Sequence, residues 1–166
     1  MRRSPKTLVN WAMAGLVILP VAAFATPNAG ILFKTILARA TAADPIHTVG
    51  HVGSWNVVLQ TNGPSDFMVQ YSGYAPGGYS GWHSHPGPVL VSVRRGTATW
   101  YEGADPACTP HEYPNGSAFV EPAGSVHTVQ NESPTDQLEL VTTYIVPVGA
   151  ATRQDEAQPA ACPHIP

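Results

Sequence analysis

The sequence of 166 residues is poor in charge, because only 11% of its residues are Asp, Glu, Lys or Arg. Its eight Lys and Arg residues are outnumbered by eleven Asp and Glu residues, and the formal net charge is −3. The chain therefore lacks the basic surface that binding to a phosphate backbone requires, and we expect no nucleic-acid partner. A hydrophobic content of 43% also excludes an acidic disordered chain.

Helical periodicity is the second absence. After Ala25, no stretch keeps a 3.6-residue apolar repeat over three turns. Residues alternate with period two instead at 55–60, 67–72, 89–94 and 138–145, and turns rich in Gly, Pro and Asn separate these segments. This pattern is typical of an all-β sandwich or barrel, which we expect as one domain over residues 26–148. Residues 149–166, rich in Ala, Pro and Gln, are expected to form an irregular C-terminal strap.

The N-terminus has the features of a secretory signal peptide over residues 1–25. Basic residues at positions 2, 3 and 6 precede an apolar run from Trp11 to Ala25, which ends in the small-x-small pattern Ala23-Phe24-Ala25. This run is shorter than the roughly 20 residues of a transmembrane helix. We therefore expect cleavage after Ala25, a secreted or periplasmic protein, and no stable membrane insertion after signal removal. Retention as an N-terminal anchor is the alternative.

Cysteine is nearly absent, since the chain holds only Cys108 and Cys162 and no C-x-x-C motif. The lack of that motif argues against a redox dithiol or a thiolate zinc site. In an exported chain, a lone pair of cysteines normally becomes oxidised. We therefore predict a Cys108–Cys162 disulfide bond that holds the strap against the barrel. The alternative is a free Cys108 near a metal ion, as a ligand or a nucleophile.

Histidine is abundant by contrast, with seven residues that point towards metal or acid/base chemistry. His83 and His85 lie two positions apart, and in a strand such residues face the same side, roughly 6–7 Å apart at Cα. Two imidazoles at this separation are a workable pair of ligands for one ion. Further along, Pro122 and Gly124 predict a turn that delivers His127 to the start of a strand, where its side chain can meet the first pair.

The two histidine clusters resemble the two signature motifs of the cupin family. The first motif, G-x5-H-x-H-x3-E-x6-G, is matched at Gly77, His83, His85 and Gly96. The second motif, G-x5-P-x-G-x2-H-x3-N, is matched at Gly116, Pro122, Gly124, His127 and Asn131. The resemblance covers residues 77–131 and implies a single cupin jelly-roll β-barrel with a metal site.

The sequence departs from the first motif at the glutamate, where Val89 stands between Pro88 and Leu90. We therefore expect a site of three histidines, His83, His85 and His127, that holds one divalent ion. Imidazole ligands do not choose between Fe, Mn, Zn, Ni and Cu here. Three neutral ligands leave the ion its full charge, so its open positions should favour water, hydroxide or an anionic substrate.

The other histidine, acidic and aromatic side chains near the motifs are not expected to bind the ion. The remaining histidines match no motif position and are expected in loops or at the surface; they are His47, His51, His111 and His164. Glu121 shares a face with Phe119 if that residue packs inward, which makes it a candidate acid/base group, but we favour an exposed position. Large aromatic residues near the motifs are expected in the core or at the rim; they are Trp82, Trp100 and Tyr101.

The fold alone does not determine the activity. The sequence favours an extracytoplasmic metal-dependent cupin, acting as an oxygenase-, isomerase- or hydrolase-type enzyme on a small chelating substrate. The alternative is a non-catalytic module that binds a metal or a small ligand, and the sequence leaves open whether the protein is an enzyme. A purely structural role fits poorly, because three inward histidines are costly to bury without a partner. We expect the protein to bind a small-molecule ligand or substrate and to form a homodimer.

Overall fold

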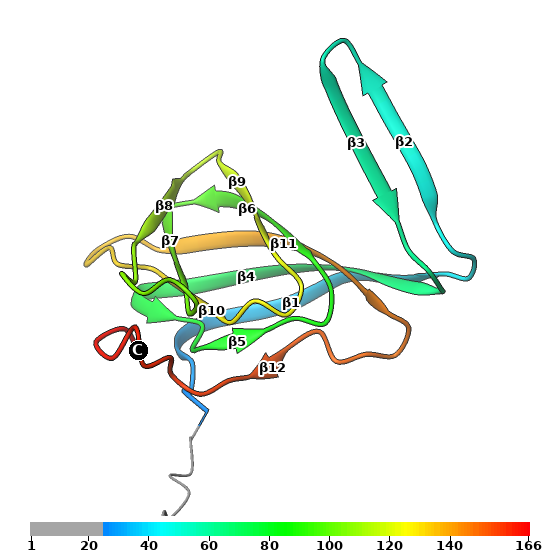
Figure 1. The fold of residues 1–166 in the computed structure, drawn as a ribbon. Helices are drawn as coiled ribbons and strands as arrows, with labels where there is room; N and C mark the ends of the chain where they lie inside the picture. The colour runs from blue at the N-terminus through cyan, green and yellow to red at the C-terminus, as the bar shows by residue number, and fades with distance from the viewer. Residues whose placement is uncertain (1–24) are drawn as a thin grey trace, which may run out of the picture.

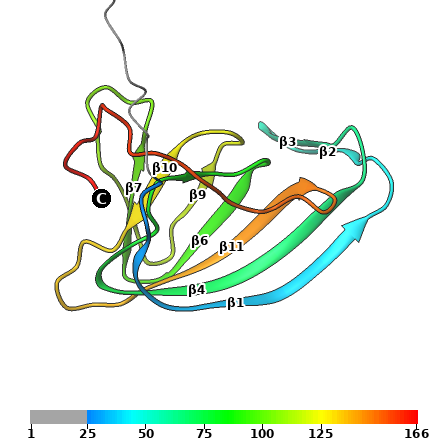
Figure 2. The ribbon, with the colours of Figure 1, turned by 90° about the horizontal axis from the view of Figure 1, so that it is seen from below.

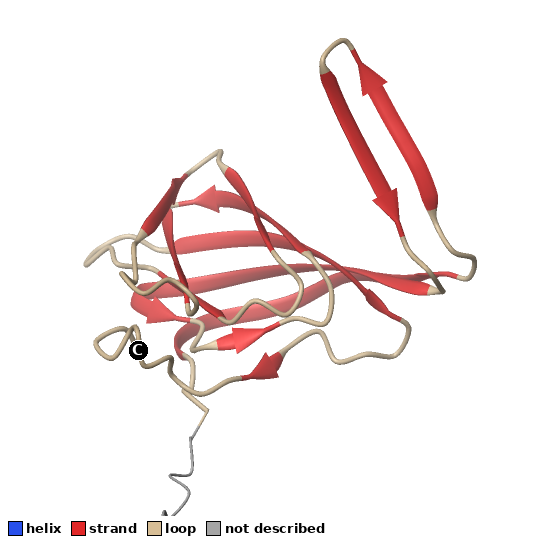
Figure 3. Ribbon diagram, in the orientation of Figure 1, coloured by secondary structure: helices blue, strands red, loops and turns tan. Residues whose placement is uncertain are grey.

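The computed structural model describes residues 25–166, so the predicted signal peptide lies outside this range apart from Ala25. These residues form strands, turns and loops with no helix (Figure 3), which confirms the all-β prediction. No helix in this part of the chain could cross a membrane. The twelve strands (Figure 1) are β1 (Ala29–Ala42), β2 (His47–Val52), β3 (Trp55–Gln60), β4 (Ser65–Tyr79), β5 (His83–Ser84), β6 (Val89–Arg95), β7 (Thr97–Glu102), β8 (His111–Pro114), β9 (Ala118–Glu121), β10 (His127–Gln130), β11 (Leu138–Pro147) and β12 (Gln154–Asp155).

Ten of these strands form one antiparallel sheet that curves into a nearly closed barrel. The order along the sheet is β12-β5-β10-β4-β11-β6-β9; β1 also pairs with β4, and β7 pairs with both β10 and β8. Figure 2 shows β1, β4, β11 and β6 side by side as one curved layer. Period-two alternation is clearest in β6 and β11, where every second residue is buried and the residues between are exposed or half-buried.

The core has two parts. The interior of the barrel is filled by valines of β6, leucines of β11 and aromatic residues that include Trp100 and Phe119. A second cluster lies where β7 and the strap meet, and it consists of Trp82, Tyr101, Cys108, Cys162 and Ile165. Three aromatic residues that we expected in the core or at the rim lie in the core: Trp82, Trp100 and Tyr101. Full burial of side chains of this size contributes about 1.5–3 kcal/mol each.

Strands β2 and β3 form a separate hairpin that projects away from the barrel (Figure 1). At its base, the backbone N–H of Thr61 donates to the carbonyl of Ile46 at 2.8 Å. Trp55 and Val58 in this hairpin are about 60% exposed (59% and 60%). The sequence assigned residues 55–60 to the barrel, and the structure corrects this. Alternation identifies a strand and its two faces, but it does not identify the sheet that the strand joins.

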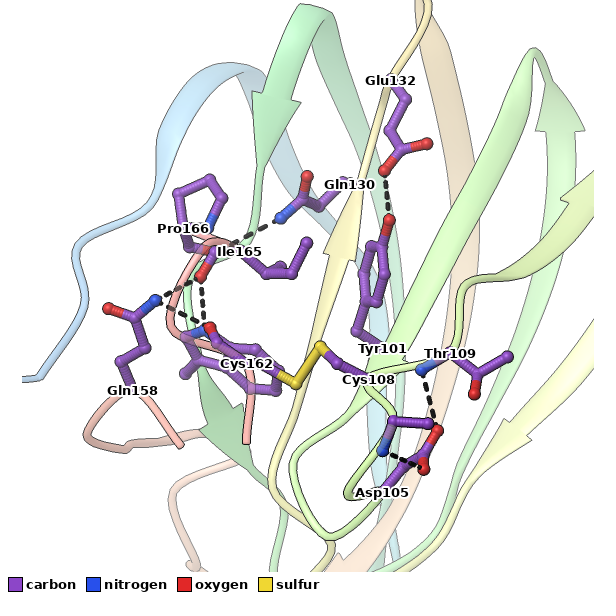
Figure 4. The surroundings of a disulfide bond; sticks show 12 residues. Tyr101, Asp105, Cys108, Thr109, Gln130, Glu132, Gln158, Cys162, Ile165 and Pro166 are labelled. Atoms are coloured by element: carbon purple, nitrogen blue, oxygen red, sulfur yellow. Dashed lines mark hydrogen bonds between the residues drawn. A yellow bond between two sulfur atoms is a disulfide. The ribbon is translucent and has the colours of Figure 1, made fainter. Parts of the chain in front are cut away.

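The C-terminal strap runs back along the barrel and is held by a disulfide bond. Cys108, in the loop after β7, is bonded to Cys162 with a Cα–Cα distance of 5.4 Å (Figure 4). This confirms the predicted disulfide and excludes the alternative of a free Cys108 as a metal ligand or nucleophile. Beside it, the carbonyl of Ile165 accepts hydrogen bonds from Nε1 of Trp82 at 3.1 Å and from Nε2 of Gln158 at 2.7 Å. The strap also adds the short strand β12 to the sheet, next to β5.

Candidate metal centre

Strands β5 and β10 bring the three predicted histidines together. His83 lies in β5, His85 directly follows it, and His127 begins β10, where it pairs with His83 across the two strands. Their side chains meet inside the barrel, with ring centroids 4.4–5.1 Å apart. One ring nitrogen from each histidine lies within 4.8 Å of the other two. All three residues are buried, with exposed fractions of 6%, 2% and 0% for His83, His85 and His127.

The turn of the second motif is fastened to the strand of the first. The backbone N–H of Gly124 donates to the carbonyl of His85 at 2.8 Å, and that of Ser125 donates to Pro122 at 3.2 Å. Gly124 has a φ of +72°, a conformation that side chains with a Cβ rarely adopt. The spacing of Pro122, Gly124 and His127 therefore reflects a tight turn that positions His127 against His85.

Asn131, the last residue of the second motif, has a structural role. It is buried, and its side-chain Nδ2 donates to the carbonyls of Tyr74, Ala75 and Asp136 at 3.3, 2.9 and 2.8 Å. Its backbone N–H donates to Gly78 at 2.8 Å. These bonds tie the end of β10 to β4, and they hold the strand that carries His127.

The histidines share one hydrogen-bonding arrangement, in which each Nδ1 lies against a backbone carbonyl. The acceptors are Gly81 for His83 at 2.8 Å, Thr152 for His85 at 2.5 Å and Ser125 for His127 at 2.9 Å. A carbonyl oxygen only accepts, so each Nδ1 carries a proton. In a neutral imidazole the other nitrogen, Nε2, then has a lone pair available for a metal ion. No signal in the sequence points to the strap carbonyl of Thr152, because it is a backbone group brought in by β12.

The unsatisfied atoms of the site fit a bound cation. Nε2 of His127 is buried and forms no hydrogen bond with any of the described residues. Burial lowers the pKa of His83 well below its usual value, and the neighbouring His127 lowers it further, so His83 is neutral and able to ligate. Converging lone pairs without a donor are unfavourable in a buried site, and a divalent ion is the group that satisfies them together.

Glu121 lies in the same site, and the exposed position that we favoured for it is wrong. Only 4% of the residue is exposed, because Phe119 packs inward and β9 keeps its alternation up to Glu121. Its Oε2 lies 3.1 Å from Nε2 of His85, and its Oε1 lies 3.4 Å from Nε2 of His127. Burial raises the pKa of Glu121, but interactions with His127 and His85 outweigh burial and lower it to about 2. This lowering requires positive charge beside the carboxyl group, which protonated imidazoles or a bound cation would supply.

The walls of the site are apolar and aromatic. Val89, at the position of the family's glutamate, is fully buried and lies directly opposite Glu121 in the β6–β9 pair. Tyr144 packs edge-on against His85 with ring centroids 5.4 Å apart, and burial raises the pKa of its phenol. The ring of Trp100 lies 6.2 Å from that of His127, and its buried Nε1 has no hydrogen-bond acceptor among residues 25–166.

The remaining histidines lie outside this cluster, as predicted. His47 and His51 are exposed on the projecting hairpin, and His164 is exposed in the strap. His111 is exposed in β8, where its ring lies 5.5 Å from that of Trp100. None of them belongs to the group of ring nitrogens described above.

Comparison with known proteins agrees with this architecture. Residues 70–144 match the family model described as the cupin domain. No curated protein matches the sequence.

Several solved structures are similar at low sequence identity. A cupin-like protein from Thermotoga maritima is 23% identical over 55% of this chain and 65% of its own, with a TM-score of 0.48. A conserved Klebsiella pneumoniae protein with a double-stranded β-helix domain is 24% identical over 68% and 85%, with a TM-score of 0.45. The DMSP lyase of Ruegeria pomeroyi is 15% identical over 51% and 41%, with a TM-score of 0.44. This chain thus spans less than two thirds of the Thermotoga protein. The histidines of both motifs lie at β5 and β10 of the barrel, and residues 70–144, which match the family model, form a cupin domain.

Proposed function

We propose that this cupin is an extracytoplasmic, metal-dependent protein in which His83, His85 and His127 hold one divalent ion. One observation carries the proposal: three buried imidazoles commit their Nδ1 atoms to backbone carbonyls and leave their Nε2 atoms for a common centre. Backbone acceptors of this kind fix the tautomer and the orientation of ligating histidines. Fe, Mn, Zn, Ni and Cu all remain candidates for the ion.

The proposed activity is an oxygenase-, isomerase- or hydrolase-type reaction on a small chelating molecule. A divalent ion held here would polarise a carbonyl group or activate water, and a redox-active ion would also support oxygenation. The chain contributes the walls that exclude water, Val89 and Tyr144, and an unpartnered donor, Nε1 of Trp100. Trp100 pairs with Val129 in β10, two residues after His127, so both side chains face the interior. Its N–H is suited to a polar atom of a substrate.

The extracytoplasmic location is part of the proposal. The Cys108–Cys162 disulfide supports it, because such bonds persist in oxidising compartments and are rare in the cytoplasm. The predicted signal peptide over residues 1–25 supports it from the sequence. Mass spectrometry of exported protein tests it directly: a mature chain that begins at Thr26 is expected, and a protein that still carries residues 1–25 would contradict cleavage.

The alternative is a non-catalytic module that binds a metal or a small ligand, and the closure of the site favours it. The three histidines are at most 6% exposed. A cavity of about 680 Å³ borders the turn that precedes His127, and its lining includes Glu102, Ser125 and Glu156 but none of the three histidines. A substrate in this cavity would contact none of the three proposed ligands.

Two measurements on protein exported with its own signal peptide test the proposal. Elemental analysis should find about one divalent ion per chain, and a metal-free protein would contradict the metal site. Oxygen consumption and product analysis with small chelating acids, thiols and phenolics then separate the two functions. Turnover that disappears with a chelator and returns with the metal supports the enzyme, whereas metal-loaded protein that is inert to the whole panel supports the binding module.

A further inference from the structure

We infer that Glu121 replaces the missing glutamate of the first motif and supplies a fourth ligand to the ion. This inference rests on the proposed function, because it concerns the same metal centre. The inferred ligand set is three histidines and one carboxylate, instead of three histidines alone. The carboxylate then comes from the second motif and not from the first.

The pairing of β6 with β9 places Glu121 where the missing carboxylate is needed. Val89 and Glu121 are directly opposite in this antiparallel pair, followed by Leu90 opposite Val120 and Val91 opposite Phe119. Residues opposite one another in a sheet project to the same face. Glu121 therefore enters the barrel beside Val89, one strand away from the position that the motif assigns to glutamate.

The buried carboxylate of Glu121 would be stabilised by a nearby cation. Among the described residues, the polar contacts of the Glu121 side chain are the ring nitrogens of His85 and His127, and no Lys or Arg forms an ion pair with it. Both of these histidines already donate through Nδ1 to carbonyls. A buried carboxylate without compensating charge is very unfavourable. A divalent ion shared with the imidazoles compensates it, and the carboxylate reduces the charge of the site from about +2 to about +1.

The distances agree with a shared ion. Two ligand atoms that are each about 2.1 Å from one metal lie about 3.0 Å apart at adjacent octahedral positions and about 3.4 Å apart in a tetrahedron. The carboxylate oxygens of Glu121 lie 3.1 Å from Nε2 of His85 and 3.4 Å from Nε2 of His127. Glu121 thus stands in the relation to two of the histidines that neighbouring ligands of one ion have.

The test measures the affinity of purified, metal-stripped protein for Zn²⁺, by competition with a chromogenic chelator. Glu121→Gln keeps the shape of the side chain but removes its charge, and we expect its Kd to rise tenfold or more. Glu139→Gln is the matched control, because Glu139 lies in β11 against Tyr71 and Arg95, outside the histidine cluster. Wild-type affinity in Glu121→Gln would overturn the inference. Failure of the wild-type protein to bind would instead overturn the proposed function.

A carboxylate transfer within the β6–β9 pair provides the second test. Val89→Glu combined with Glu121→Val returns the carboxylate to the motif position, and its Zn²⁺ affinity should lie within tenfold of wild type, well above that of Glu121→Val alone. A double variant that binds Zn²⁺ as weakly as Glu121→Val would contradict the exchange.

The visible spectrum of bound Co²⁺ reports on coordination. Glu121→Gln should change the d–d bands, and an unchanged spectrum would show that Glu121 is not a ligand. Circular dichroism melting curves establish that each variant is folded.

Discussion

Removal of the Cys108–Cys162 disulfide tests how strongly the C-terminal strap stabilises the barrel. The bond joins residues 54 positions apart and lies in the second core cluster, where Cys162 is fully buried. Without it, the strap is held by β12, by the contacts of Ile165 and by its other hydrogen bonds. Cys108→Ala combined with Cys162→Ala removes the covalent link and places no hydroxyl group in the cluster.

The expected loss of stability follows from the length of the closed loop. For a loop of this size, the chain-entropy relation gives about 4 kcal/mol at 25 °C. Unfolding entropy near the midpoint is about 2.1 cal/mol/K per residue, or about 0.3 kcal/mol/K for a domain of roughly 140 residues. The double variant should therefore melt about 13 °C below the oxidised wild type.

Differential scanning calorimetry under non-reducing conditions measures this shift. Wild-type protein treated with dithiothreitol should show a similar decrease in Tm, and the double variant should not respond to the reductant. A decrease of less than about 2 °C in both cases would refute the reasoning. It would mean that the strap is already held in place without the bond, or that the unfolded chain gains no freedom when the bond is absent.

Three further predictions concern the barrel and the hairpin. Hydrogen bonds from Thr41, Arg39 and Gly149 lower the pKa of Asp66 to about 2. The stability that these bonds contribute is present above about pH 4 and is lost as the pH falls towards 2. Asp66→Asn should therefore flatten the dependence of Tm on pH in that window. Asn131→Ala removes a donor to three carbonyls and should cost about 2–4 kcal/mol in urea unfolding, whereas a loss below 0.5 kcal/mol would contradict the structural role. Replacement of residues 47–60 by a two-residue turn should leave the metal content unchanged, and light scattering of this variant beside wild type tests whether the predicted homodimer forms through the hairpin.

Local spacing was sufficient to predict the strands, and the resemblance to the two cupin motifs predicted the meeting of the three histidines. Alternation puts His83 and His85 on one face of a strand, and the turn around Gly124 delivers His127 to the neighbouring strand. The pairing of His83 with His127 is itself long-range, and the two motifs of the family encode it only when they are taken together. The outward positions of His47 and His164 could be inferred from the absence of any such pattern.

Contacts between segments that belong to no common motif could not be predicted from the sequence. The inward position of Glu121 depends on the register between β6 and β9, in which Val89 faces it. Period two with Phe119 was the one signal in the sequence, and the neighbouring Pro122 obscured it because strand ends often turn away. The carbonyl that orients His85 belongs to Thr152, 67 residues along the chain, and no side-chain pattern marks it.

The metal content of natively exported protein tests the central claim most directly. Wild-type protein should contain about one divalent ion per chain, and His83→Ala, His85→Ala and His127→Ala should each lose most of it, because each removes one of the few protein ligands. The matched controls His47→Ala and His164→Ala change exposed histidines outside the barrel interior and should keep the wild-type content. Equal metal content in all five variants, or none in the wild type, would contradict the account.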